Sequence, residues 1–504
     1  MSVKPAIPVW ISALCALGCV ALDAKQAAGT EARTGTPPNV LLLLADDLGW
    51  MDVGFNNAQT FYDTPNLDRL AAKGMRFTQA YAACPVCSPT RVSLLTGCYP
   101  ARLQTTDYFG APQPEAIVAS AKSGKGHGRF RALPLLPAPY VDRLPLAQTT
   151  LAEVLREAGY ATFFAGKWHM GGEGYSPTES GFDVNVAGHR RGGPYGKGRY
   201  FHPFEMPNLG SEPGDHLPAR LAEETIEFMG QNRDRPWFSM LSFYSVHTPL
   251  MGRPDLVEHY EKKRAQLGLE DIFEQEGERK VRVVQSHAVY AAMVAALDEA
   301  VGEVLDALTE LGLAENTLVI FYSDNGGLST SEGHPTSNLP LRAGKGWLYE
   351  GGIREPCIFR FPGRIEAGAI CNEPISSIDI APTVLSAVGS SAHPEAFVDG
   401  LDIAPLLAQR GQLQRDALYW HYPHWGNQGG TPGAAIRRGD WKWVEFYTEN
   451  TEGELYDLRT DTGETRNVAA THPRIVRELQ EQLAAWRREV GARMPTRNPH
   501  AQEN

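Results

Sequence analysis

A cysteine at the start of a predicted helix has the surroundings that most clearly indicate chemistry in this sequence. Residues 87–91 are Cys-Ser-Pro-Thr-Arg, and they lead into an apolar stretch that ends at Gly97. Proline suits the first turn of a helix and glycine suits its end, so we expect Cys87 at the N-terminal end of a short helix. That end is positive and would stabilise an anion. Arg91 follows by one turn on the same face, where its planar guanidinium can bind an oxyanion.

Two structural interpretations compete with a reactive Cys87. Free cysteine is commonly a small buried apolar residue, which here would only cap the helix. Alternatively, Cys84 and Cys87 have the spacing of a redox or zinc pair. No second Cys/His pair stands at ligand spacing in the sequence, and a redox or zinc pair does not require the proline and arginine that follow.

A pair of aspartates follows the most apolar strand that the sequence predicts. Residues 39–44 form a largely apolar run suited to a strand buried on both faces, and Asp46 and Asp47 come just after it. Adjacent carboxylates repel each other unless a positive group lies between them. Ligands of open α/β sheets bind at the carboxyl ends of strands, so a divalent metal is the economical explanation. The alternative is an acidic turn in which one aspartate caps the next element.

Three further predicted strands end next to polar side chains that could do chemistry. They cover residues 160–166, 236–243 and 317–322, and the polar residues that follow them are Lys167, His169, His247, Asp324 and Asn325. Lys167 and His169 stand two apart on an extended segment, which would place them on one side of it. Because parallel strands end at one edge of a sheet, all four clusters should converge. Three carboxylates and an amide with no soft ligand specify a hard cation, first Ca²⁺ and then Mg²⁺.

Three loops are candidates for the rim of such a site. Lys345 lies in a glycine-rich segment, residues 341–352, whose backbone can approach a ligand closely. Residues 188–204 hold two histidines, three arginines and a lysine, which would form either a basic lip over an anionic substrate or a solvated loop. Residues 105–146 lack clear periodicity and are predicted to be a long surface insertion near the active site.

The order of predicted elements indicates the fold. Strands and helices alternate over most of the chain, which predicts an α/β fold with a large, mostly parallel sheet sandwiched by helices. From about Asp416 the segments become short, aromatic and alternating, as in an antiparallel sheet, and residues 473–490 form a closing amphipathic helix. We therefore predict a catalytic domain over residues 39–410 and a smaller C-terminal α+β subdomain over residues 411–504.

The first residues are typical of an export signal. Lys4 precedes an apolar run that is too short for a stable membrane span, which predicts a signal peptide over residues 1–24 and a disordered lead-in over residues 25–38. A periplasmic or secreted protein is expected, and lipid anchoring at Cys19 is the alternative. Two of the seven cysteines lie in this leader, so an odd number remains and at least one should be unpaired. Whether Cys98, Cys357 and Cys371 form bridges stays open.

Composition excludes some partners. The chain has 504 residues, 42% of them hydrophobic, which is enough for one large core and a smaller one. A net charge of −12 argues against binding to nucleic acids or anionic membranes, because both require a broad basic surface. If the substrate is an anion, its attraction must be local.

The segment around Cys87 resembles the signature of the type I sulfatases, in which this cysteine is oxidised to formylglycine by a maturation enzyme. The similarity extends from about Pro38 to the last helix and implies an alkaline-phosphatase-like fold. It also implies the roles of individual residues. The metal ligands would be Asp46, Asp47, Cys87 as formylglycine, Asp324 and Asn325, and the catalytic residues would be Cys87, Arg91, Lys167, His169, His247 and Lys345.

The resemblance also implies a mechanism. A hydrated aldehyde offers one hydroxyl to attack sulfur and a second whose deprotonation by His169 expels sulfate, while His247 or Lys345 protonates the departing alcohol. A plain thiol or serine lacks that second step. The same fold and ligands also serve phosphate and phosphonate monoesters, which leaves those esters as alternatives. A non-catalytic glycan-binding relative is disfavoured because no expected catalytic position is substituted.

The segment 421–430 resembles one found in bacterial sulfatases that act on sulfated galactose or N-acetylgalactosamine. His421, His424 and Asn427 are therefore the predicted substrate-binding residues, and the alternative is a tight aromatic turn. We predict an exo-acting carbohydrate sulfatase, for which small aryl sulfates would be poor substitutes and a sulfated saccharide is the partner. An arylsulfatase is the competing assignment.

Overall fold

The computed structural model describes residues 36–123, 133–393, 395–449 and 451–501. The described residues from Pro37 onward form one compact unit. The predicted signal peptide and Cys19, and nearly all of the predicted lead-in, lie outside the described residues. Within the described part of the chain, none of the helices combines the length and the apolar character needed to cross a membrane.

A nine-stranded sheet with the order β11-β2-β10-β9-β1-β6-β4-β5 forms the centre of the unit, and β12 pairs with β2 beside this path. In chain order the strands are β1 (Asn39–Ala45), β2 (Met75–Tyr81), β4 (Ala161–Gly166), β5 (Val184–Val186), β6 (Trp237–Ser242), β9 (Thr317–Ser323), β10 (Arg354–Arg360), β11 (Ala369–Cys371) and β12 (Ile375–Ser376). Strand β10 runs antiparallel to both neighbours, and all other pairs are parallel. The predicted mostly parallel sheet is confirmed.

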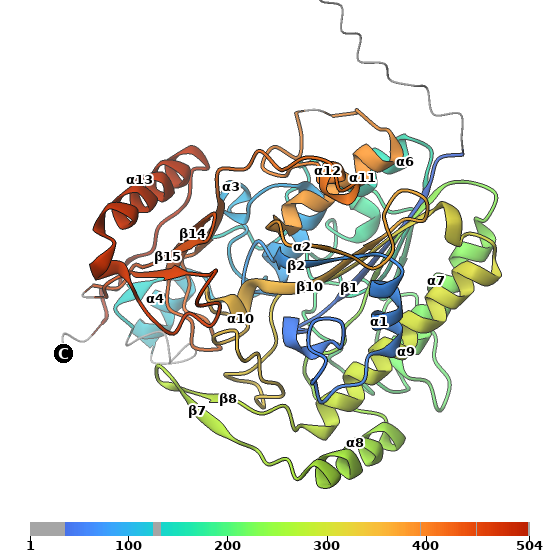
Figure 1. The fold of residues 1–504 in the computed structure, drawn as a ribbon, viewed down its shortest axis with the longest axis horizontal. Coiled ribbons are helices and arrows are strands. Elements are labelled where there is room, and N and C mark those ends of the chain that lie inside the picture. The colour runs from blue at the N-terminus through green and yellow to red at the C-terminus, as the bar shows by residue number, and fades with distance from the viewer. Residues whose placement is uncertain (1–35, 124–132, 394, 450, 502–504) are drawn as a thin grey trace, which may run out of the picture. The chain divides into compact units, whose positions relative to one another are not determined.

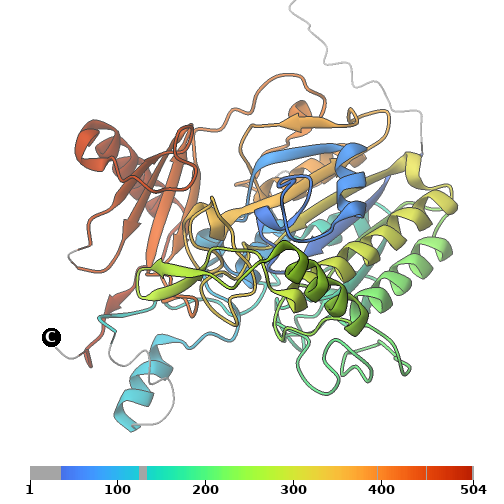
Figure 2. The ribbon, with the colours of Figure 1, turned by 60° about the horizontal axis from the view of Figure 1, so that its bottom comes forward.

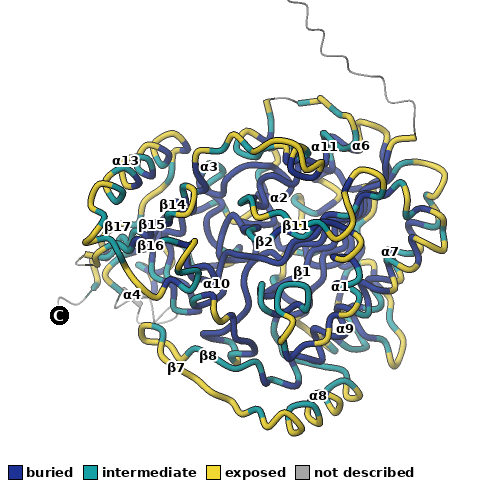
Figure 3. The backbone as a smooth tube through the Cα atoms, viewed as in Figure 1, coloured by how far each residue is buried: buried dark blue, intermediate teal, exposed yellow. Residues whose placement is uncertain are grey.

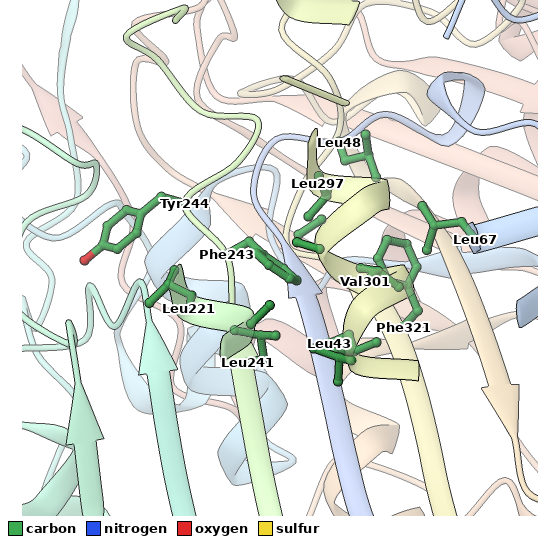
Figure 4. Packing of buried hydrophobic residues seen from close by; sticks show 14 of the residues in the cluster. Leu43, Leu48, Leu67, Leu221, Leu241, Phe243, Tyr244, Leu297, Val301 and Phe321 are labelled. Atoms are coloured by element: carbon green, nitrogen blue, oxygen red, sulfur yellow. The ribbon is translucent and has the colours of Figure 1, made fainter. Parts of the chain in front are cut away.

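Strand β1 shows why this sheet is covered on both faces. Its side chains alternate between two cores, because Leu41 and Leu43 pack into one cluster and Leu42 and Leu44 into the other. Figure 4 shows Leu43 in the first cluster, packed with side chains of neighbouring strands and of a covering helix. A strand buried in this way must be apolar at every position, as its sequence is.

Helices cover each face of the sheet (Figure 1). One face carries α1 (Pro65–Ala72), α7 (Leu217–Gln231) and α9 (Ala288–Glu310), and α8 (Pro254–Leu267) packs on α9. The other face carries α2 (Cys87–Thr96), α6 (Leu151–Glu157), α11 (Ile380–Val388) and α12 (Ala404–Leu407). The central strands are buried, whereas much of α8 and α13 is exposed (Figure 3).

A second sheet lies near the C-terminus. Its four antiparallel strands have the order β13-β14-β15-β16, and α13 (Pro473–Glu489) packs on β14 and β15 (Figure 2). The strands are β13 (Leu418–Tyr422), β14 (Gly433–Arg438), β15 (Trp441–Phe446) and β16 (Glu454–Asp457). The predicted antiparallel strands and closing helix are confirmed. The division at residues 410 and 411 into two domains stays a prediction.

The remaining elements are short. They are α3 (Pro100–Leu103), α4 (Pro114–Ser123), β3 (Leu135–Leu136), β7 (Phe273–Glu276), β8 (Arg279–Arg282), α10 (Glu350–Ile353) and β17 (Thr496–Arg497), with 3-10 turns at Trp50–Asp52, Pro177–Ser180, Ala314–Asn316, Ser377–Asp379 and Ala469–Thr471. The β7–β8 hairpin was not predicted from the sequence.

Candidate active site

Helix α2 positions Cys87 as its first residue. Val86 is extended before the helix, all ten helical residues are buried, and Gly97 ends the helix with a left-handed φ of 60°. Because this helix is buried along its whole length, the position of its N-terminal end is fixed by the surrounding core. The Cys87 Sγ lies 3.7 Å from Asp46 Oδ1. Burial, only partly opposed by Lys167 and Lys345, raises the pKa of the Cys87 thiol to about 12.

Three carboxylates meet beside that cysteine. Asp46 and Asp47 follow β1, Asp324 follows β9, and one potential ligand atom from each lies within 4.8 Å of the others and of Cys87. Asp47 has a left-handed φ of 61°, and its backbone N–H donates to Asp324 Oδ1 at 3.2 Å. The strand ends therefore converge as the parallel topology requires.

The donor set fits a hard cation. Asn325 donates to Asp47 Oδ1 through its Nδ2 at 2.8 Å, while its own Oδ1 is buried and has no hydrogen-bond partner among the described residues. A buried oxygen without a donor beside three carboxylates is an arrangement that Ca²⁺ or Mg²⁺ satisfies. The residues that would hold the ion are those predicted: Asp46, Asp47, Asp324, Asn325 and the side chain at position 87.

Each carboxylate has a basic side chain as its nearest partner, and Arg91 also lies 3.7 Å from Asp46 Oδ1 through Nη2. The pairs are Lys167 Nζ with Asp46 Oδ2 at 2.6 Å, Lys345 Nζ with Asp47 Oδ1 at 2.6 Å, and Arg91 Nη2 with Asp324 Oδ2 at 2.7 Å. None of these six side chains is more than 5% exposed. Three negative and three positive groups balance, so a divalent cation would make the site positive by two charges. This local charge can attract an anion although the chain carries −12 overall.

The pKa values of these groups reflect burial and close pairing. Burial, opposed mainly by Lys167, raises the pKa of Asp46 well above its ordinary value. At Asp47 burial acts in the same direction, but the ammonium groups of Lys345 and Lys167 hold the pKa below its ordinary value. Burial disfavours the Lys345 ammonium, yet Asp47 and other acidic groups keep its pKa well above the usual range. Lys345 is therefore a stable cation.

Arg91 lies behind the carboxylates and does not line the pocket. Its guanidinium is fully buried, and besides Asp324 it donates to Lys167 O and Ser242 Oγ, each at 2.7 Å. Arg91 is not among the residues that line the cavity, and its Nε and Nη1 already donate within the fold, so this geometry does not support direct binding of a substrate oxyanion by Arg91. Arg91 instead positions the aspartates.

We expect Arg91→Met to lower the free energy of unfolding by about 3–5 kcal/mol, because it leaves buried carboxylates without their partner. Chemical denaturation monitored by tryptophan fluorescence would measure this. Arg69→Met is the matched control: Arg69 pairs with Asp306 at 2.7 Å, but both side chains are exposed, by 38% and 57%. That substitution should cost about 1 kcal/mol or less. Equal losses in the two variants would contradict the assignment.

His169 and His247 reach the pocket in different ways. His169 has a left-handed φ of 53°, so the chain is not extended there and the alternation argument for Lys167 and His169 is wrong. A turn brings His169 to the pocket, with Nε2 at 3.1 Å from Phe109 O. His247 lies 3.8 Å from Asp47 through Nε2. Its Nδ1 lies 2.7 Å from Thr248 O, which can only accept, so Nδ1 carries the proton.

Both histidines are uncharged. Burial, with the neighbouring Lys345 and Lys167, lowers the pKa of His247 to about 3. Burial and Lys167 hold the pKa of His169 well below its usual range. In this state each ring has an unprotonated nitrogen, and Lys345 keeps its proton.

A cavity of about 320 Å³ opens over Cys87. Cys87, His169, His247 and Lys345 line it, whereas Arg91 and Lys167 are fully buried and are not among its lining residues. The full lining is Val86, Cys87, Tyr108, Phe109, Gly110, His169, Gly192, Tyr195, His247, Glu332, Lys345, Asn427 and Gln428. The predicted insertion over residues 105–146 thus contributes to the rim.

Two predicted substrate-binding residues do not reach this cavity. On β13, Trp420 and Tyr422 pack into one cluster, and strand alternation turns His421 to the opposite side, where it contacts Tyr447 Oη at 2.7 Å and Arg493 O at 2.8 Å. His424 is 1% exposed and lies 2.8 Å from Thr106 Oγ1. These assignments are corrected: both histidines are held within the fold. Of the three, only Asn427 lines the cavity.

Sequence reasoning missed several lining residues. Tyr195 lies in the basic segment 188–204, but the arginines and lysine of that segment are exposed and do not line the cavity. Glu332 stands alone among small residues, and Gln428 follows Asn427 without a recognised pattern of its own. Only the general rule that loops rim such sites could have indicated them. Cys84, Cys87, Cys98, Cys357 and Cys371 are all free, so the described cysteines form no bridges.

Comparison with known proteins adds to this geometry. The Sulfatase family pattern matches residues 38–390, and a pattern described as N-sulphoglucosamine sulphohydrolase, C-terminal, matches residues 343–489. Human arylsulfatase A is 32% identical over 88% of this chain and 87% of its own length. Mouse N-acetylgalactosamine-6-sulfatase is 30% identical over 87% of this chain and 77% of its own. The crystal structure of Ps i-CgsB in complex with k-i-k-neocarrahexaose superposes with a TM-score of 0.72 and 26% identity, over 93% and 95% of the two chains.

Proposed function

Because the chain belongs to the sulfatase family, within the alkaline phosphatase superfamily, and is therefore a sulfuric ester hydrolase, we propose that it removes sulfate from galactose or N-acetylgalactosamine units of sulfated polysaccharides. The observation that carries this proposal is the meeting of Cys87 with three carboxylates under an open cavity. The carbohydrate class is supported by two relatives: one is an N-acetylgalactosamine-6-sulfatase, and the other was crystallised with a neocarrahexaose.

The nucleophile of the proposal is formylglycine at position 87. The thiol sulfur marks the place that the hydrated aldehyde would occupy, next to Asp46. With a pKa of about 12, the unmodified thiol is protonated at neutral pH and is a weak nucleophile, which favours a modified residue. When bound, Ca²⁺ would supply positive charge that favours ionisation of the hydroxyl and binds sulfate oxygens.

The side chains of the cavity have separate roles in this proposal. Lys345 points its ammonium at Asp47 from the cavity wall, where it can bind a sulfate oxygen and donate a proton to the departing alcohol. Uncharged His169 accepts a proton beside position 87, and His247 accepts one through Nε2. Lys167 and Arg91 keep Asp46 and Asp324 in place from below. Substitutions of Lys345, His169 or His247 should lower kcat more than they raise KM.

Exo action is part of the proposal. The cavity of about 320 Å³ is at the small end of the range for ligand sites, about 300–1,000 Å³. Such a space suits one terminal sugar unit and its sulfate better than an internal segment of a polymer. The N-terminal residues support export, and a formylglycine-generating enzyme of the host is the required partner.

A desulfation screen tests the substrate class. We expect the mature protein to release sulfate from galactose-4-sulfate, galactose-6-sulfate or N-acetylgalactosamine-6-sulfate with a kcat/KM at least about tenfold above that for an aryl sulfate. Ion chromatography of released sulfate measures it. The 32% identity with arylsulfatase A makes preference for the aryl ester the competing result, which would contradict the carbohydrate assignment. Phosphate and phosphonate monoesters in the same screen test the ester class.

A further inference from the structure

One acidic side chain lines a cavity that is otherwise suited to an anion. Glu332 is the only aspartate or glutamate among the described residues that line this cavity, and it lies there with Lys345, His247 and Asn427. It is not part of the carboxylate cluster beside Cys87. A carboxylate facing a sulfate-binding space opposes the charge of the substrate, so its presence requires a reason.

The contacts of Glu332 hold it in one orientation. Oε1 accepts from Asn427 Nδ2 at 2.8 Å and from Gln428 Nε2 at 2.9 Å, and Oε2 accepts from Thr248 Oγ1 at 3.3 Å. The backbone at Glu332 has a left-handed φ of 53°, which few side chains adopt freely. All three partners donate, as a charged carboxylate requires. Burial raises the pKa of Glu332, but the Lys345 ammonium and the hydrogen bond from Asn427 help to bring it below its ordinary value, which agrees with that state.

Lys345, the lysine that lines the same cavity, does not neutralise the Glu332 carboxylate through a direct salt bridge. The Lys345 ammonium pairs with Asp47 at 2.6 Å, and within the described part of the chain Glu332 forms no salt bridge. A carboxylate has about four acceptor positions, so three donors leave capacity on the Glu332 oxygens for one more. A sugar hydroxyl can fill it, whereas a sulfate or carboxylate group has no proton to give and carries the same charge.

Resting on the proposed carbohydrate function, we infer that Glu332, held by Asn427 and Gln428, is a specificity-determining residue that restricts the substrate to sugar units with a single sulfate. It accepts a hydrogen bond from a hydroxyl of the ring that carries the scissile sulfate. It disfavours rings that carry a second anionic group. The sequence motif of position 87 and the metal ligands do not impose this restriction, because they contact only the scissile sulfate.

The test compares a ring with one sulfate and the same ring with two. We would measure kcat/KM for N-acetylgalactosamine-6-sulfate and for N-acetylgalactosamine-4,6-disulfate with the wild type and with Glu332→Gln, which keeps size and one acceptor oxygen. The wild type should prefer the monosulfated unit by at least about tenfold, and the variant should lose most of that preference. Glu481→Gln, an exposed position on α13, makes the same change in net charge and should leave the ratio unchanged.

Salt dependence gives a second measurement that needs no variant. Raising ionic strength should narrow the preference of the wild type, because screening weakens repulsion between like charges. An unchanged ratio in Glu332→Gln, with wild-type activity on the monosulfated unit, would overturn this inference and leave the proposed function intact. A preference of the wild-type protein for the disulfated unit would also overturn this inference and leave the proposed function intact. A wild type that hydrolyses neither saccharide but turns over an aryl sulfate would overturn the proposed function and this inference together.

Discussion

Cys87→Ser should lower the turnover of sulfate esters by at least about 10³-fold, the scale seen when a nucleophile is removed. Serine would place a hydroxyl at the N-terminus of α2, where the sulfur of Cys87 lies 3.7 Å from Asp46 Oδ1. It offers only one hydroxyl, however, and cannot release sulfate by the route that a hydrated aldehyde provides. Assays of sulfate release at saturating substrate measure the loss.

Cys84→Ser is the matched control for that result. Cys84 is also buried and lies three residues earlier, but its Sγ contacts only Thr106 O, at 3.9 Å, among the bonds the structure gives it. This variant should keep kcat within about threefold and lose only stability. Mass spectrometry of the tryptic peptide that contains position 87 should find the aldehyde in active protein. Fully active protein with an intact thiol would refute the formylglycine proposal.

Removing the cation should lower activity by at least about 10²-fold, because the proposal places it against both the nucleophile and the sulfate. Treatment with EGTA followed by desalting should give this loss, and Ca²⁺ should restore activity at lower concentration than Mg²⁺. Ca²⁺ should also raise the melting temperature, since a ligand at about 100 times its Kd adds about 2.7 kcal/mol to the free energy of unfolding. Calorimetry with and without Ca²⁺ measures this independently of activity.

A pair of aspartate variants separates metal binding from general damage. Asp47→Asn should abolish the stabilisation by Ca²⁺, because Asp47 is one of the four clustered ligands. Asp52→Asn is the control: Asp52 is equally buried, but it accepts hydrogen bonds from Tyr290 Oη and Thr336 Oγ1, each at 2.6 Å, and is outside the cluster. The Asp52→Asn variant should have a lower melting temperature than the wild type, but Ca²⁺ should still raise that temperature. A full Ca²⁺ response in Asp47→Asn would contradict the site.

The strand ends could be predicted because apolar runs and polar ends are local features of the sequence. The run before Asp46 is apolar at successive positions because both faces of β1 are covered, and parallel topology then places Asp324 beside it. The antiparallel direction of β10 could not be deduced, since its residues suit either pairing.

The cavity wall was less predictable because its residues come from loops. Glu332, Tyr195 and Phe109 have no periodic context, and their positions depend on turns with unusual backbone angles and on contacts between distant segments. The error at His421 was avoidable, because alternation along β13 with the buried Trp420 already predicts that it faces away.

The pairing of Asp46, Asp47 and Asp324 with an equal number of buried basic side chains has a consequence for the order of assembly. Unlike a cluster of acids that repel until an ion arrives, these groups compensate one another within the bare polypeptide. We therefore expect that folding can finish before the proposed cation binds, and that its loading is a late, reversible event that follows the concentration of the ion around the folded protein.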